Sequence, residues 1–258
     1  MDLGLKGKIA LVTGGTSGIG LAIAQKLAEE GCAVAVCGRD RARLDAAAGA
    51  VPGAKTFVAD LCVSQQVAAL VDDVVVSLGG LDIVVSNAGT HVPGRLDEVD
   101  SSTLVHHFTT KVAGAWELAR AAVPAMKKRG GGRFIVIIGQ AGKVPQANAI
   151  ASNVVNVAQH AFVKSLSDEL APHRILVNAV CPSRIKTPLT HGLALHNEIY
   201  LGRSLEQQES RWGAEVPLGR WGEPDDIANA VAFLASNRAG FIVGANIDVD
   251  GGHQRSIF

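Results

Sequence analysis

The sequence of 258 residues contains a single tyrosine, Tyr200, and aromatic residues make up only 4% of it. Its hydrophobic content of 48% must therefore come mostly from Ala, Val, Ile and Leu, the residues that fill buried parallel strands. Lys+Arg and Asp+Glu both number 24, and no dense basic run is present. Without a net positive charge or a basic patch, we expect no nucleic-acid partner.

Long apolar runs are also missing, because no stretch of about 18 apolar residues occurs that could span a membrane. The chain passes from Met1 almost directly into a strand-like segment, without a basic region followed by a cleavable apolar segment. We therefore expect a soluble, cytoplasmic protein with no membrane partner. The four cysteines show no metal-like spacing, so we interpret them as free thiols and expect no metal site.

The sequence does contain an alternation of short β-branched runs and longer Ala- and Leu-rich segments. Strands are predicted at residues 9–12, 33–37, 55–58, 83–86, 133–138, 175–180 and 247–249. Helices are predicted to begin near Ile19, Ala42, Ser64, Ser101, Asn153 and Pro224. Because each crossover must place its helix on a face of the sheet, this alternation predicts an α/β fold. We expect a Rossmann-like, doubly wound parallel sheet of about seven strands with helices on both faces, forming one domain over residues 1–258.

One segment departs from this alternation. Residues from about 188 to 220 are polar, contain His and Glu, and lie between the sixth predicted strand and the last predicted helix. In an open α/β sheet, such an insertion lies at the carboxyl ends of the strands, where ligands bind. We therefore predict that it forms a lid over a substrate.

A glycine-rich run, Thr13-Gly14-Gly15-Thr16-Ser17-Gly18-Ile19-Gly20, follows the first predicted strand and leads into a helix. Glycines permit a tight turn and a close approach of the backbone to a ligand, and the helix N-terminus presents free N–H groups to a pyrophosphate. Taken alone, the run is also compatible with a tight turn that binds nothing.

Further segments follow in a fixed order along the chain. They are Asp60, Ser86-Asn87-Ala88-Gly89, Val177-Asn178-Ala179-Val180-Cys181-Pro182, Arg220-Trp221-Gly222-Glu223-Pro224 and Asp248-Val249-Asp250-Gly251-Gly252. With the TGxxxGxG loop, they make nearly the whole chain resemble the short-chain dehydrogenase/reductase family, especially its branch of β-ketoacyl-ACP reductases and small-sugar dehydrogenases. The resemblance implies an NAD(P)-dependent oxidoreductase that acts on a carbonyl or alcohol of a small-molecule substrate.

The resemblance also implies a cofactor site. Asp60 would bind the adenine, Asn87 to Gly89 would line the ribose side, and Thr187 would hold the nicotinamide carboxamide. The full implied set is Gly14, Thr16, Ser17, Gly18, Ile19, Gly20, Arg39, Asp60, Leu61, Asn87, Ala88, Gly89, Asn156, Pro182, Ile185 and Thr187.

The choice between NAD and NADP depends on the end of the second predicted strand, where no acid occurs and Arg39 follows Gly38. An acid there accepts a hydrogen bond from the ribose 2′-hydroxyl of NAD, whereas a guanidinium favours the 2′-phosphate of NADP. NADP(H) is therefore favoured over NAD(H). The alternative is that Arg39 is a solvated loop charge paired with Asp40.

The family's catalytic residues are replaced in this sequence. The family uses an Asn, a Ser, and a Tyr with a Lys four residues later, and the matching positions here are Lys111, Gly139, Ser152 and Asn156. A lysine beside the tyrosine lowers the phenol pKa, so the usual proton donor is missing. Tyr200 lies in the predicted lid, far from Ser152 in sequence.

Three side chains are candidates for the missing acid. Ser152 has a hydroxyl but no cation one helical turn away, because Asn156 can bind a ribose and cannot lower a pKa as a charge does. Lys111 and His91 could supply charge or a proton instead. The alternative interpretations are a surface-loop histidine for His91 and, for Lys111, a buried-to-rim lysine that snorkels from its helix or pairs with an acid.

We therefore expect an oxidoreductase with atypical proton-transfer residues. Two alternatives stay open: a cofactor-binding pseudoenzyme that acts as a sensor or partner subunit, and a non-redox enzyme that uses the same pocket. By the resemblance, the helices that carry Lys111 and Ser152 and the segment from Asp250 to Phe258 would form a homotetramer, or a heteromer with an active relative. His107 and His160 would then be subunit contacts.

Overall fold

The computed structural model describes residues 2–202 and 204–255, without the side chains of 196–201, and over this range it contains a seven-stranded parallel sheet in the order β3-β2-β1-β4-β5-β6-β7. The strands are β1 (Ile9–Thr13), β2 (Ala33–Gly38), β3 (Lys55–Val58), β4 (Ile83–Ser86), β5 (Gly132–Ile137), β6 (Ile175–Pro182) and β7 (Asn246–Val249). The predicted Rossmann-like fold is confirmed, and β3 and β4 have the predicted bounds.

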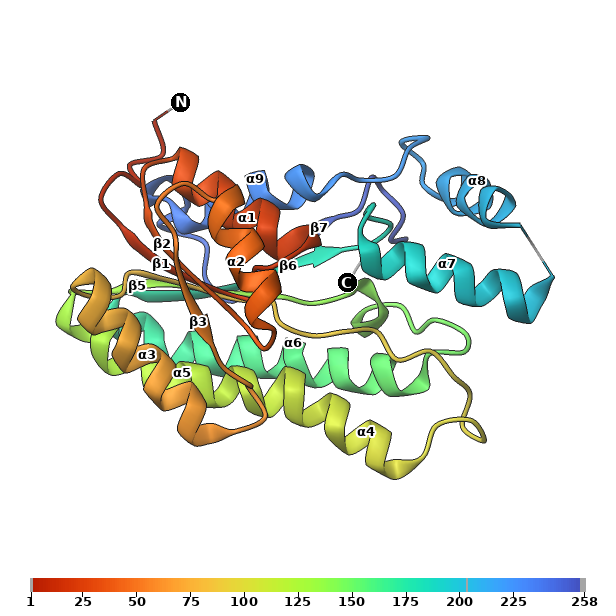
Figure 1. The fold of residues 1–258 in the computed structure, drawn as a ribbon, viewed down its shortest axis with the longest axis horizontal. Coiled ribbons are helices and arrows are strands. Elements are labelled where there is room, and N and C mark those ends of the chain that lie inside the picture. The colour runs from red at the N-terminus through yellow and green to blue at the C-terminus, as the bar shows by residue number, and fades with distance from the viewer. Residues whose placement is uncertain (1, 203, 256–258) are drawn as a thin grey trace.

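Helices cover both faces of the sheet (Figure 1). They are α1 (Gly18–Glu29), α2 (Arg41–Ala50), α3 (Ser64–Leu78), α4 (Ser101–Phe108), α5 (Gly114–Lys128), α6 (Ile150–Leu170), α7 (Pro188–Leu201), α8 (Leu205–Glu215) and α9 (Pro224–Ala235). One apolar core packs α3, α5 and α6 against the sheet, and a second packs α1, α2 and α9 against the other face. No described helix has the length and apolar character needed to cross a membrane.

The strand order places a crevice at β1. Leu11 of β1 pairs with Ala35 of β2 on one side and with Val84 of β4 on the other. The chain therefore builds the sheet outward in both directions from β1. In open α/β sheets, ligands bind outside the carboxyl ends of the strands at such a reversal.

The helix predicted to begin near Ser101 is interrupted. α4 ends at Phe108, a π-helical turn follows from Thr109 to Ala113, and α5 begins at Gly114. The wider turn buries Lys111. Turns of this kind often occur at functional sites.

Two segments of the sequence analysis lie partly beyond the described residues. The insertion at about 188–220 folds into α7 and α8 beside the carboxyl edge of the sheet (Figure 1), but the side chain of Tyr200 is outside the described part. Ile257 and Phe258 are likewise outside it.

The burial of His107 does not fit the interpretation of that residue as a subunit contact, whereas the same interpretation of the half-buried His160 stays a prediction. His107 is only 2% exposed, and its Nε2 lies 3.4 Å from the Ser152 hydroxyl. The Nδ1 atom of His160 lies 2.9 Å from the Asn246 Oδ1 atom. Both imidazoles therefore contact groups of their own chain. The four cysteines are free, as predicted, and the described residues contain no cluster of metal-ligating side chains.

Candidate active site

The glycine-rich loop after β1 has a backbone that only glycine fits at two points. Gly14 has a φ of +62°, in the left-handed region. A side chain on Gly20 would collide with the Gly14 carbonyl and with the Asn87 amide. The Asn87 amide nitrogen donates to the carbonyl oxygens of Thr13 and Gly14, at 2.9 and 3.1 Å, and so fastens the loop to the end of β4. The loop leaves the N-terminus of α1 open to a close ligand such as a pyrophosphate, so it fits a dinucleotide.

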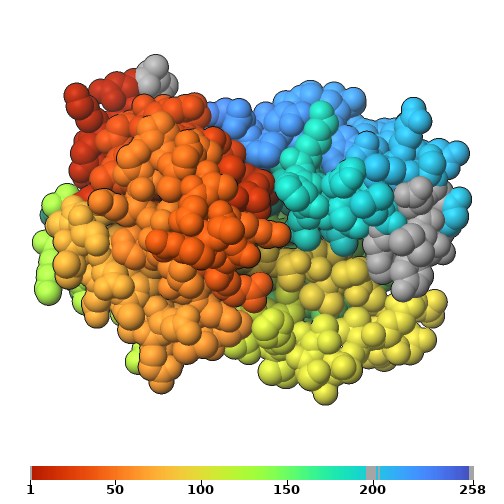
Figure 2. Space-filling view, viewed as in Figure 1, coloured from red at the N-terminus to blue at the C-terminus, as the bar shows by residue number. Residues whose placement is uncertain are grey.

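A cavity of about 1290 Å³ extends from this loop to α8 and the C-terminal segment. Figure 2 shows that surface hollowed between the orange residues before β4, the cyan α7 and the yellow residues after β4. The predicted site residues that line it are Gly14, Ser17, Gly18, Ile19, Gly20, Asn87, Ala88, Gly89, His91, Lys111, Ser152, Asn156, Pro182, Ile185 and Thr187.

Four predicted cofactor residues lie outside this lining: Thr16, Arg39, Asp60 and Leu61. The Asp60 carboxylate accepts a hydrogen bond from the Cys62 N–H at 2.9 Å, and Leu61 is buried in the core at 6% exposure. Arg39 is exposed at the end of β2. No salt bridge within the described residues joins it to Asp40, whose carboxylate instead accepts from the Arg43 N–H at the start of α2.

The ammonium group of Lys111 is buried between the loop after β4 and α6. The Lys111 stem passes so close to Gly89 that a side chain there would contact its Cγ, Cδ and Cε atoms at 3.1–3.3 Å. Its Nζ donates to the Asn156 Oδ1 at 2.5 Å. No described carboxylate forms an ion pair with it, and burial lowers its pKa from 10.5 to about 8. The pairing of Lys111 with an acid is therefore wrong for the described residues, whereas a buried lysine that extends from its helix agrees with the structure.

Asn156 connects this ammonium to the end of β5. Its Nδ2 donates to the Gly139 carbonyl at 3.2 Å, while its Oδ1 accepts from Lys111. A Cβ at Gly139 would lie only 3.1 Å from that Nδ2, so the missing side chain gives the amide its room. The amide is thus fixed by both of its polar atoms, and it holds the Lys111 amine in one place.

The Ser152 hydroxyl is already engaged within the protein. It accepts from the Val92 N–H at 2.9 Å and can donate to the Val92 carbonyl at 3.2 Å or to His107, and the residue is 1% exposed. Its observed partners fasten the loop after β4 to α6. Such a hydroxyl is a poor proton donor for a substrate.

His91 is half-buried and lines the cavity. Burial, together with the charges of Lys111 and Arg184, lowers its pKa to about 4. The lowered pKa favours a neutral imidazole at pH 7 and so argues against a charge on His91, whose part in proton transfer stays a prediction. His91 lies on the loop after β4 and is only partly exposed.

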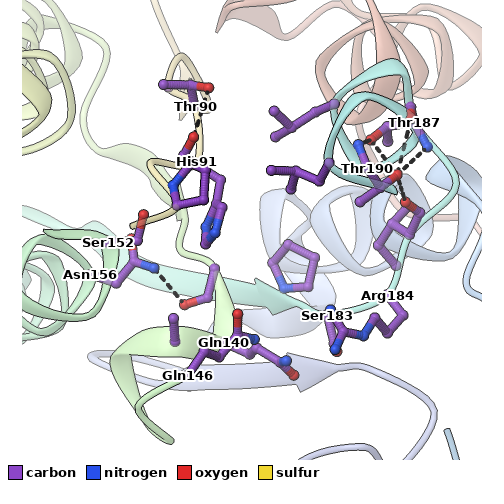
Figure 3. A pocket seen from close by; sticks show the side chains of 18 of the residues that line it. Thr90, His91, Gln140, Gln146, Ser152, Asn156, Ser183, Arg184, Thr187 and Thr190 are labelled. Carbon is purple, nitrogen blue, oxygen red and sulfur yellow. Dashed lines mark hydrogen bonds between the residues drawn. The ribbon is translucent and has the colours of Figure 1, made fainter. Parts of the chain in front are cut away.

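Thr187 and the lid on the opposite wall of the cavity were predicted from the sequence, but Arg184 and the contribution of the C-terminal segment were missed. Figure 3 shows Ser152 and Asn156 on one side and Arg184, Thr187 and Thr190 on the other, with Gln140 and Gln146 below. Arg184 comes from the loop directly after β6, and α8 and the C-terminal segment complete this wall. The position of Arg184 after a strand end was the one available signal.

Comparisons with known proteins give matches over nearly the whole chain. The family model described as enoyl-(acyl carrier protein) reductase matches residues 14–254. Dehydrogenase/reductase SDR family member 4 from Homo sapiens is 33% identical over 253 residues, covering 96% of this chain and 88% of that protein.

Two solved structures have the same fold. The L-sorbose reductase from Gluconobacter frateurii, complexed with NADPH and L-sorbose, is 33% identical with a TM-score of 0.94, covering 100% of both chains. The 3-ketoacyl-(acyl-carrier-protein) reductase from Brucella melitensis, complexed with NADH, is 30% identical with a TM-score of 0.87 and covers 96% of this chain and 99% of its own.

Proposed function

Because the chain belongs to the short-chain dehydrogenase/reductase family of oxidoreductases, we propose that it interconverts a carbonyl and an alcohol with NADPH, using Lys111 as the proton donor. The observation that carries this proposal is the Lys111 ammonium, which is buried beside Gly89 and bound to Asn156 without a counter-ion among the described residues.

The cofactor site is proposed from the residues that line the cavity at the glycine-rich loop. The backbone from Gly14 to Gly20 would hold the pyrophosphate, and Thr187, whose side chain lies against Gly18, would hold the carboxamide. Bound NADPH supplies a hydride to the carbonyl carbon while the carbonyl oxygen takes up a proton, which gives the alcohol and NADP⁺.

Outside the cavity lining, Asp60 and Leu61 would border the adenine. Arg39, exposed at the end of β2, would pair with the 2′-phosphate, so NADP(H) is preferred to NAD(H). The relatives with bound NADPH and with bound NADH support a nicotinamide cofactor of either kind, and Arg39 decides our choice between them.

Lys111 would donate the proton to the carbonyl oxygen. A general acid works best when its pKa lies near the operating pH, and burial has brought this ammonium to about 8. Asn156 orients the ammonium through its Oδ1, and Ser152 keeps the loop at Val92 in place. The ammonium also stabilises negative charge that develops on the oxygen, because its surroundings exclude water.

The test is NADPH consumption by the purified protein with a panel of ketones, aldehydes and alcohols. We expect turnover with at least one compound class and a loss of about 100-fold or more in the Lys111→Met variant. Lys164→Met, at an exposed lysine of α6 paired with Asp168, is the control and should keep wild-type turnover.

Calorimetry with NADPH separates the alternatives. Binding without turnover on the whole panel would support a pseudoenzyme, and conversion of a substrate without any change in NADPH would support a non-redox enzyme. Binding of neither dinucleotide would contradict the cofactor assignment itself.

We also propose that residues 1–258 act as one domain, with α7 and α8 as a substrate lid at 188–220, and that the protein works in the cytoplasm.

Self-association is proposed because α4, α5 and α6 expose Val105, Phe108, Trp116, Val154 and Val157. Light scattering at micromolar concentration should give a homotetramer. A stable monomer would contradict this, whereas association only after mixing with an active relative would indicate a heteromer.

A further inference from the structure

A guanidinium is held in a fixed position on the cavity wall opposite Lys111. The Arg184 Nη2 donates to the Glu215 carboxylate at 2.9 Å. The same guanidinium lies 4.6 Å above the ring of Trp212. An ion pair on one side and an aromatic face on the other restrict the rotation of this long side chain, so it is ready to bind a ligand at little further entropic cost.

The C-terminal segment joins this wall through His253. The His253 Nδ1 lies 2.6 Å from the Ser183 hydroxyl and 3.0 Å from the Gln140 Oε1. Its Nε2 lies 4.0 Å from the Glu215 carboxylate. Loops after β5 and β6, helix α8 and the C-terminal segment are therefore linked by polar contacts around one end of the cavity.

Two buried donors on this wall lack acceptors. Among the described residues, neither the Arg184 Nε nor the Gln254 Nε2 has a hydrogen-bond partner, and both residues line the cavity. A buried N–H without an acceptor destabilises the free protein, so such groups are usually satisfied by a ligand or by water. A ligand that satisfies both donors must present acceptor atoms, as a carboxylate does with its two oxygens.

The charges around the cavity favour the same kind of ligand. The described cationic residues that line it are Arg95, Lys111, Arg184, Arg211 and Arg255, and the carboxylates are Glu98 and Glu215. Within the cluster, Glu215 faces both Arg184 at 2.9 Å and the Arg211 Nε at 3.4 Å. Glu215 offsets only one of these two guanidiniums, and Arg255 of the C-terminal segment adds a further positive charge, so this wall favours an anionic ligand such as a carboxylate.

We infer that the substrate is an oxo-carboxylate, or the corresponding hydroxy-carboxylate, whose carboxylate binds Arg184 and Gln254 while its carbonyl faces Lys111. This inference rests on the proposed function for the redox step only. The carboxylate site itself consists of groups outside the glycine-rich loop and outside the Lys111–Asn156 pair.

The test compares each of a series of oxo-carboxylates, from pyruvate to longer chains, with its own methyl ester, because the ester keeps the carbonyl and removes the charge. With NADPH saturating, kcat/KM should favour the acid in at least one pair. Arg184→Gln should lower kcat/KM for that acid by about 10- to 100-fold, mainly through KM, and leave the ester unchanged. Arg184→Lys should restore part of the loss, because it keeps a charge without the two-pronged geometry.

Two further variants guard against simple misfolding. Gln254→Leu removes a donor without touching the Arg184–Glu215 pair, and it should weaken acid binding by a smaller factor. Arg238→Gln changes an exposed arginine outside the cavity and should alter neither substrate.

The inference and the proposed function can fail separately. Equal turnover of acids and esters, unchanged by Arg184→Gln, would overturn the inference and leave the reductase intact. If no compound turns over, calorimetry of the same carboxylates with the NADP⁺-loaded protein shows whether the carboxylate site exists without the reductase activity. Binding that Arg184→Gln removes would support the carboxylate site without the reductase, and no binding of any acid would overturn the site.

Discussion

Replacing Lys111 by Met should make the protein more stable and less active. Burial lowers the Lys111 pKa from 10.5 to about 8, which corresponds to about 3 kcal/mol against the charged form. Methionine has a similar length and carries no charge, so the variant avoids this cost. It leaves the Asn156 Oδ1 without its donor, which costs about 1–2 kcal/mol. The net gain in the free energy of unfolding at pH 7 is about 1–2 kcal/mol, or about 4 °C in Tm for a chain of this size.

The sign of this effect depends on pH. Between pH 8 and 10.5, the unfolded chain keeps the Lys111 proton and the folded chain releases it, so the stability contributed by this group rises with pH. The advantage of Lys111→Met should therefore be complete below pH 8 and shrink as the pH rises toward 10.5. Above that range, the neutral amine still binds Asn156 at no cost in charge, and the wild type should be the more stable protein.

The assay is calorimetric melting of the wild type, Lys111→Met and Lys164→Met at a series of pH values. The difference in Tm between the first two isolates Lys111, because all other titrating groups are shared. Lys164→Met changes an exposed, surface-paired lysine and should stay within about 0.5 kcal/mol of the wild type throughout. If Lys111→Met is destabilised equally at every pH, the ammonium is satisfied in the folded protein and the reasoning is refuted.

Four further outcomes are expected. Gly20→Ala should weaken NADPH binding by at least about 10-fold, because the new Cβ would collide with the Gly14 carbonyl. The control is Gly49→Ala in α2, where a Cβ would meet no atom within 4 Å; it should keep NADPH binding and gain up to about 1 kcal/mol of stability. Arg39→Ala should raise the Kd for NADPH by about 10-fold and leave that for NADH almost unchanged, as measured by calorimetry. Ser152→Ala should lower Tm but retain turnover, since its hydroxyl fastens a loop; complete loss of turnover in a folded variant would instead identify it as the donor. Trp116→Glu should split the assembly in light scattering, because this half-exposed side chain lies on the apolar face of α5.

The sequence predicted the sheet and the cofactor loop because both depend on residues close together in the chain. The β-branched runs define the strands, and the glycines before α1 define the turn. The requirement for glycine at position 20 is partly local as well, because one of the two groups that a Cβ there would meet is the Gly14 carbonyl. The other, Asn87, comes from the end of β4, which the parallel order of the strands places beside β1.

The sequence named Lys111 as a candidate proton-transfer residue, but its surroundings could not be predicted in the same way. Lys111 and Asn156 are 45 residues apart, and their contact depends on a π-helical turn that hydrophobic periodicity does not reveal. Ser152 was a candidate because of its hydroxyl, but only the structure shows that Val92, 60 residues away, occupies that hydroxyl. Residue type indicates which chemistry is available, whereas the partners decide whether it is free to act.

The wall around Arg184 was hardest to foresee. Its members come from the end of β6, from α8 and from the C-terminal segment, and no local motif joins them. Charge pairing between Arg184 and Glu215 spans 31 residues. Only the topology of the sheet brings these segments to one edge.

The pH dependence of carbonyl reduction tests the role of Lys111 most directly. With the best substrate of the panel and saturating NADPH, kcat/KM should be level below pH 8 and fall about tenfold per pH unit above it, because the ammonium must carry its proton to donate it. Lys111→Met should lower kcat/KM by about 100-fold or more and remove this decline. A Lys111→Met variant that keeps the wild-type rate and the same decline above pH 8 would contradict the assignment of Lys111 as the proton donor.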